Sequence, residues 1–220
     1  MRKLRIFGLA LIALVAVSAI GATMASADEL TATKYPATTI GSNEKEVFTD
    51  EFTTTAGTVK CTTASYKGTL KEKSTTLTVA PTYSGCTGFG FPATVTTTGC
   101  NYLFHVNGTT STVGTVDLVC EAGKEITVVA KSGETVKCTV HVGSQAGLGT
   151  VTYSSIGAAG ETEEVTAFAD LSGVKYTHTP GTGVGACVNG SGTGTLKAKA
   201  TLTGLEDEGV NHIGLILSNS

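Results

Sequence analysis

The chain has 220 residues, of which 40% are hydrophobic, 6% aromatic and 15% charged, and it contains 28 glycines but no tryptophan. Residues 28–220 carry 12 basic and 18 acidic side chains, a formal charge of −6, and every one of those bases is lysine. Nucleic-acid recognition needs a basic surface and favours arginine, so we expect no nucleic acid among the partners. The length suits one domain with a single continuous core.

The first 27 residues have the pattern of a secretory signal peptide. Residues 1–5 are basic, residues 6–17 are apolar, and Ala25-Ser26-Ala27 supplies the small residues of a cleavage site. We therefore expect a mature protein that is secreted or extracellular, including association with the cell wall or cell surface. The alternative is an uncleaved anchor, because about 20 apolar residues can span a bilayer. Membrane contact is expected only through this segment.

The rest of the chain favours β-strands. Threonine contributes 40 of the 220 residues of the full chain, and threonine and valine suit a pleated sheet better than a helix. Apolar and polar positions alternate at 135–142 and 196–202, and no window shows a convincing apolar period of 3.6. We expect 28–45 to be a loose N-terminal arm and 46–220 to be a single domain with strands near 46–54, 57–69, 74–82, 91–98, 101–107, 114–120, 125–131, 135–142, 149–155, 163–170, 173–179, 193–203 and 210–217.

Short strands at regular spacing predict an all-β fold. We expect an antiparallel β-sandwich, or a distorted barrel, of about 10–12 short strands, bridged by disulfides and preceded by the signal-peptide helix.

Six cysteines lie after the signal segment, and an even number in an exported chain predicts three disulfides. Their closest spacing is 14 residues, so the close pairs typical of a zinc site are missing. Six cysteines allow 15 connectivities. If neighbouring strands form hairpins, Cys100 falls nearly opposite Cys120 and Cys61 comes within reach of Cys86, which leaves Cys138 with Cys187.

No catalytic, cofactor-binding or metal-binding residue is predicted. The run from Gly181 to Ala186 fits the spacing of a dinucleotide fingerprint, but the residues that follow cannot begin a helix. No G-x-S-x-G motif is present. A metal site would need several histidines to converge, whereas each histidine stands alone on an expected strand, mostly on the solvent face, at His105, His141, His178 and His212.

Two acidic clusters in the sequence have two interpretations, solvated turns or a Ca²⁺ site. The first contains Glu161, Glu163 and Glu164, and the second contains Glu206, Asp207 and Glu208 with Asn211 nearby. Loop carboxylates bind Ca²⁺ in many secreted proteins, so a weak Ca²⁺ site at 206–211 stays open. The spaced ligands of a known calcium loop are missing from both clusters.

Aromatic residues bear on carbohydrate binding. Without tryptophan, a sugar-stacking platform would depend on tyrosines, of which the candidates are Tyr66, Tyr83, Tyr102, Tyr153 and Tyr176. Most of them share a strand with core residues, so we expect them to pack inside with the hydroxyl at the rim.

Three stretches carry a resemblance to known sequences. They are Thr82-Tyr83-Ser84-Gly85-Cys86, Gly99-Cys100-Asn101-Tyr102 with the preceding Ala93-Thr94-Val95, and Cys138-Thr139-Val140 followed by Ser144-Gln145. The chain resembles uncharacterised exported, cysteine-containing, β-rich proteins of high-GC Gram-positive soil bacteria over about half of its mature length. The resemblance implies compartment and fold, and it transfers no functional residue.

These observations predict an exported extracellular or cell-surface protein that acts as a non-enzymatic binding or structural module. Cell-wall or environmental polysaccharide is the partner class to test first. The alternatives are a secreted hydrolase acting on polysaccharide, whose sign would be a pocket with two or more perturbed titratable groups, and a carbohydrate-binding module, whose sign would be a row of exposed Tyr or Phe.

Overall fold

A computed structural model describes residues 29–43, 50–106, 112–156, 160, 163–182, 186–206 and 211–218. The regular structure of these residues is entirely β, which confirms the all-β class. The expected signal peptide and its cleavage site lie outside the described residues. The strands are β1 (Glu29–Ala32), β2 (Ala37–Ser42), β3 (Asp50–Thr54), β4 (Gly57–Leu70), β5 (Thr76–Gly88), β6 (Phe91–Thr96), β7 (Cys100–Val106), β8 (Val113–Cys120), β9 (Ile126–Ser132), β10 (Thr135–Val142), β11 (Thr150–Ile156), β12 (Glu164–Pro180), β13 (Gly190–Leu205), β14 (His212–Ile213) and β15 (Leu215–Ser218).

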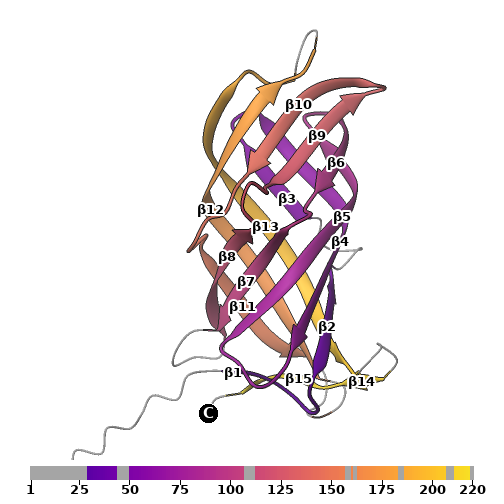
Figure 1. Cartoon of the computed structure of the whole chain (residues 1–220), viewed down its shortest axis with the longest axis vertical. Coiled ribbons are helices and arrows are strands. Elements are labelled where there is room, and N and C mark those ends of the chain that lie inside the picture. The colour runs from indigo at the N-terminus through magenta and orange to yellow at the C-terminus, as the bar shows by residue number, and fades with distance from the viewer. Residues whose placement is uncertain are drawn as a thin grey trace, which may run out of the picture.

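Strands β2 to β14 belong to one antiparallel sheet that closes on itself at two levels (Figure 1). The long strands β4, β5, β12 and β13 run through both levels, with β4 paired to β5 and β12 paired to β13. At one level β3, β6, β9 and β10 fill the gaps between these two ribbons, and we call this closure the upper ring. At the other level β2, β7, β8 and β11 fill them, and this closure is the lower ring. Of the two architectures that the sequence left open, the protein adopts the distorted barrel.

Both long ribbons change their inward-facing positions where the rings meet. On β12 the buried residues up to Leu171 are odd-numbered except for Thr166, and those from Val174 onward are even-numbered. The pairing register with β13 shifts between Ser172 and Val174. The residue between them is Gly173, whose φ of 81° suits a β-bulge. On β5 the change falls near Gly85, which has a φ of 61°. These bends let one ribbon line two rings with different neighbours.

Side chains close the pairing gaps between the two rings. Strand β4 pairs with β2 from Ser65 onward and with β3 up to Cys61, and Asn43 bridges the interval by accepting from the Ala64 amide at 3.0 Å. On β12, Gln145 accepts from the Lys175 amide at 2.7 Å. The Gln145 amide group also donates to the Lys175 carbonyl at 2.8 Å. These bonds satisfy backbone groups that no strand reaches.

A side chain also closes the pairing gap on β5, at Pro81. The hydroxyl of Thr97 donates to the carbonyl of Pro81 at 2.6 Å. Proline has no N–H to offer a neighbouring strand, so its position in the gap loses no ladder hydrogen bond.

Three segments differ from the sequence-based expectation. Residues 28–45 were expected to form a loose arm, yet they contain β1 and β2, and β2 is an integral strand of the lower ring. Its inward residues include Ala37, Thr39 and Gly41, which are too small or too polar to give a visible apolar alternation. The expected strands 163–170 and 173–179 are one strand, β12, because a bulge continues the pairing. Residues 210–217 are split into the short strands β14 and β15.

The cysteines form three disulfides, Cys61–Cys86, Cys100–Cys120 and Cys138–Cys187, the same pairing that the expected hairpins imply. The first two join residues that lie directly opposite each other on adjacent strands. The third ties β10 to the segment that precedes β13. Three disulfides indicate an oxidising compartment. Within the described residues, no helix has the length and apolar character needed to cross a bilayer.

Candidate functional site

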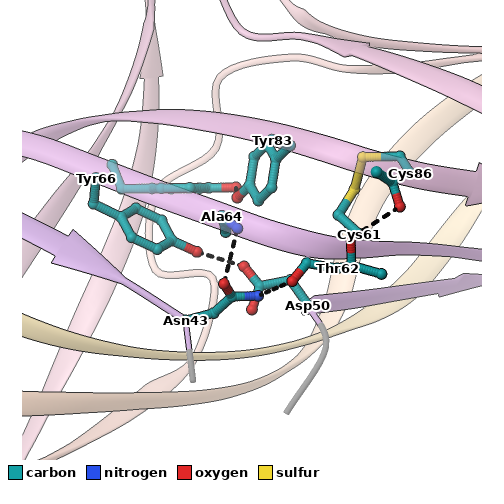
Figure 2. The surroundings of a disulfide bond; sticks show 10 residues. Asn43, Asp50, Cys61, Thr62, Ala64, Tyr66, Tyr83 and Cys86 are labelled. Atoms are coloured by element: carbon teal, nitrogen blue, oxygen red, sulfur yellow. Dashed lines mark hydrogen bonds between the residues drawn. A yellow bond between two sulfur atoms is a disulfide. The ribbon is translucent and has the colours of Figure 1, made fainter. Parts of the chain in front are cut away.

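A polar cluster lies inside the barrel where the two rings meet. Asp50 begins β3, and the hydroxyl of Tyr66 on β4 donates to its Oδ2 atom at 2.6 Å (Figure 2). The ring of Tyr66 meets the ring of Tyr83 on β5 edge to face, with centroids 6.3 Å apart. The Tyr83 hydroxyl in turn lies 3.1 Å from the hydroxyl of Tyr102 on β7. Four residues from four strands therefore form one buried group, the interior cluster.

The register of the strands places these side chains together. Val79 of β5 pairs with Tyr102, and Ala64 of β4 pairs with Tyr83, so the tyrosines occupy inward positions of three consecutive strands. Asp50 takes the inward position opposite Cys61. A carboxyl group there is 4% exposed, where an apolar residue would be the ordinary choice.

Burial dominates the ionisation of the cluster. It raises the pKa of Asp50 from 3.8 to about 6, against the opposing effects of hydrogen bonds from the Tyr66 hydroxyl and the Lys199 backbone amide. Burial and the nearby Asp50 carboxylate hold the pKa of Tyr66 well above its usual value. Burial also raises the pKa of Tyr102 to about 12. At neutral pH the cluster is thus one carboxylate surrounded by neutral phenols.

One oxygen of the carboxylate has no partner. Among the described residues, Asp50 Oδ1 is fully buried and makes no hydrogen bond. A buried charged oxygen without a partner is costly, and such groups in folded proteins normally have a structural or functional explanation. Asp50 has one structural role, which is to accept a hydrogen bond from the backbone amide of Lys199. Lys199 lies on β13 between the residues that pair with β3 and those that pair with β2.

Asp50 lines a cavity of about 70 Å³ in the upper ring. The rest of its wall is almost wholly apolar and consists of Phe52, Val59, Cys61, Tyr83, Val95, Tyr102, Leu118, Ile126, Val128, Val142, Leu148, Val174 and Leu196. A second cavity of about 30 Å³ lies in the lower ring, and Tyr83 and Tyr102 line both. A water molecule needs roughly 10–15 Å³ of such space, and an apolar cavity of about 150 Å³ holds benzene. The upper cavity therefore has room for a few non-hydrogen atoms.

The shape and lining of the upper-ring cavity limit the kinds of molecule that it can bind. An apolar, partly aromatic wall with one negative hydrogen-bond acceptor can hold a small molecule that carries a donor or a positive charge. The cavity does contain several titratable groups with perturbed pKa values, which is the sign stated above for a hydrolase. Its volume, however, is far below that of one sugar ring, so a polysaccharide cannot be the molecule it receives.

The structure places the five candidate tyrosines inside the barrel. Four are buried and Tyr83 is half-buried, as expected for packing. The hydroxyls of Tyr66, Tyr83 and Tyr102 bond within the interior cluster instead of reaching the rim. Strands β4, β5 and β7 bring these three tyrosines together, so their hydroxyls bond to groups inside the barrel instead of to water. They form no exposed sugar-stacking row.

Two of the four histidines form acid–base pairs on the outer wall. His105 Nε2 lies 3.0 Å from Asp117 Oδ2, and His141 Nδ1 lies 2.6 Å from Glu125 Oε1. The Gly147 amide also donates to Asp117, and this bond is the main reason why the pKa of Asp117 is lowered. Asp117 thus holds the segment around Gly147 against β8.

His178 departs from the expected solvent-facing position. It is 4% exposed, stacks on Tyr176 with ring centroids 5.6 Å apart, and bonds the carbonyl of Val188 through Nδ1. The even-numbered face of β12 turns inward after the bulge, which explains its burial. It borders an open notch of about 270 Å³ beside the Cys138–Cys187 disulfide. His212 is exposed, and the described residues contain no group of three metal-ligating side chains.

The remaining sequence motifs do not assemble a site among the described residues. Glu206 is bound by Lys34 and by Asn211 Nδ2, while 207–210 lie outside the described part of the chain. Glu164 accepts from Thr203 at 2.6 Å. The amides of Gly181 and Ala186 both donate to the Lys137 carbonyl, and a strand follows them instead of a helix.

The sequence did contain a signal for Asp50. In Asp50-x-Phe52 the acid occupies the same strand face as a phenylalanine. An acid on an apolar strand face is a candidate buried carboxyl. Comparison of the chain with families of known proteins, with curated proteins and with solved structures gives no match.

Proposed function

We propose that the chain is an exported, non-enzymatic binding module of the extracellular space or cell surface, and that its ligand site is the upper-ring cavity beside the interior cluster. The observation that carries the proposal is Asp50, a buried carboxyl group whose Oδ1 atom has no hydrogen-bond partner among the described residues, in the wall of an otherwise apolar cavity. A protein that needed this position only for packing would be more stable with an apolar residue there.

Two further features support the location outside the cytoplasm. The three disulfides suit an oxidising compartment, and the N-terminal pattern suits export. The resemblance to exported proteins of Gram-positive soil bacteria agrees with both. Intact mass of the protein from culture supernatant tests this part: a chain that begins at Asp28 supports it, and a membrane-held chain that begins at Met1 contradicts it.

The binding part is tested with xenon, an apolar probe that needs no particular chemistry. Xenon at a few atmospheres is added to the oxidised protein, and methyl ¹H–¹³C spectra are recorded. We expect shifts at Val59, Leu118 and Val128, which line the cavity, and none at the exposed Val119. If no cavity methyl responds, the interior is closed to ligands and the proposed site is wrong.

A further inference from the structure

We propose that the upper-ring cavity selects a small primary alkylammonium ion, whose charged group pairs with the carboxylate of Asp50 while its alkyl part fills the apolar space. This inference rests on the proposed function, since it names the ligand class of the same cavity. It follows from the charge, the size and the wall of the cavity.

Among the described residues that line the cavity, Asp50 alone supplies a charge. The titratable groups that face it are Tyr66 from β4, Tyr83 from β5 and Tyr102 from β7, and burial raises the pKa of all three phenols. From β13 it meets the backbone amide of Lys199. The part of the cavity lining that the structure describes contains no lysine, arginine or histidine. The charge that these described residues contribute therefore approaches −1 as the pH rises above about 6.

Among the functional groups of small molecules, an ammonium group complements the negative charge of Asp50 best. Oδ1 lacks a hydrogen-bond donor, and a primary ammonium supplies three donors and a full positive charge. A neutral donor such as a hydroxyl would satisfy the bond but leave the charge uncompensated, and an anion would be repelled. The aromatic rings of Phe52, Tyr83 and Tyr102 in the wall offer further attraction to a cation.

The volume limits the alkyl part. If benzene with its six carbons occupies a cavity of about 150 Å³, a cavity of about 70 Å³ takes on the order of three non-hydrogen atoms. Ethylammonium has three. A ligand of this size binds with a dissociation constant no tighter than about 1 mM, because each non-hydrogen atom contributes at most about 1.5 kcal/mol.

The probe for the test is ethylammonium chloride, with ethanol as a neutral molecule of the same shape. Binding is followed by the methyl spectra described above, at pH 8 and pH 5. We expect ethylammonium to bind at least tenfold more tightly than ethanol at pH 8. At pH 5 the affinity for ethylammonium should fall about tenfold, because a carboxyl group with a pKa of about 6 is then about 10% ionised.

Two variants separate the roles. Asp50→Asn keeps the shape and an acceptor for Tyr66 but removes the charge, and it should abolish the preference for ethylammonium over ethanol. Glu51→Gln removes the neighbouring carboxylate on the outer face and should leave binding unchanged. If Asp50→Asn fails to fold, the pH dependence of the natural protein still decides.

The outcomes are distinct. Equal binding of ethylammonium and ethanol, with xenon still entering, would overturn the ammonium inference and leave the cavity as a general apolar site. Failure of xenon to enter would overturn the proposed function itself. Preferential binding that disappears both at pH 5 and in Asp50→Asn would establish the inference.

Discussion

Replacing Asp50 with asparagine should stabilise the protein at alkaline pH. The native environment raises the pKa of Asp50 from 3.8 to about 6, so the folded state holds the proton more tightly than the unfolded chain does. The stabilisation associated with that proton is complete below pH 3.8 and is lost as the pH rises through 6. The difference between a pKa of 3.8 and one of about 6 corresponds to about 3 kcal/mol of unfolding free energy.

An uncharged amide avoids this loss while still accepting the hydrogen bond from Tyr66. We therefore expect Asp50→Asn to raise the free energy of unfolding by about 2–3 kcal/mol at pH 8 and by almost nothing at pH 4. Urea unfolding with the disulfides intact, at pH 4, 6 and 8, measures the difference. In thermal unfolding at pH 8 the gain corresponds to about 5–10 °C for a chain of this size.

Glu51 provides the matched control on the next residue. Its carboxylate lies on the outer wall 3.0 Å from Lys60, and a hydrogen bond from Lys60 is the main reason why its pKa is lowered. Glu51→Gln should therefore destabilise the protein slightly at neutral pH, by less than about 1 kcal/mol, and the effect should fade in acid. An Asp50→Asn variant that is less stable than the natural protein at pH 8, or whose effect is the same at all pH values, would refute the reasoning.

Three further perturbations test the fold. Replacing Cys138 and Cys187 with serine opens a loop of 49 residues and should cost on the order of 4 kcal/mol in urea unfolding; a loss below about 1 kcal/mol would show that the bridge is dispensable. Gln145→Ala removes both bonds to the β12 backbone in the gap between rings and should cost about 1–3 kcal/mol, with faster hydrogen exchange on the adjacent part of β12; unchanged exchange there would contradict the bridging role. Gly114→Ala would place a methyl group 1.9 Å from a backbone oxygen and should cost about 3 kcal/mol or more, whereas Gly143→Ala meets nothing within 4 Å and should stay within about 0.5 kcal/mol; similar effects at the two glycines would show that the strands near Gly114 are not so close.

Local patterns in the sequence were sufficient to predict much of the wall. Threonine and valine enrichment with period-two alternation predicts strands such as Thr135–Val142, which the structure has at those bounds. Hairpin register also brings Cys100 opposite Cys120. These features depend on residues close in the chain, and such contacts leave a periodic signal.

The two-level closure could not be predicted in the same way. It depends on pairings between distant segments, such as Thr201 with Ser42, and on the change of inward face at Gly85 and Gly173. A glycine in a threonine-rich strand looks like a turn, so the sequence divided β12 at Gly173. Strand β2 was missed because its inward residues are small.

The interior cluster depends on the same long-range closure. Its tyrosines are separated by 17 to 36 residues in the sequence and meet only because β4, β5 and β7 are consecutive in the sheet. In the sequence Asp50 lies two residues before Phe52, on the same strand face, but a solvent-exposed acid would fit that pattern equally well. Its burial follows from Tyr66 and from the apolar wall opposite, which the sequence does not bring together.

The most direct test of the account is a pH titration of the Asp50 side-chain carboxyl carbon by ¹³C NMR, with and without saturating ethylammonium. The account predicts a midpoint of about 6 in the free protein and a lower midpoint in the presence of ethylammonium, because the cation binds the ionised form. A midpoint near 3.8 that does not move when ethylammonium is added would contradict it, since the carboxyl group would then be solvated and would take no part in an interior site.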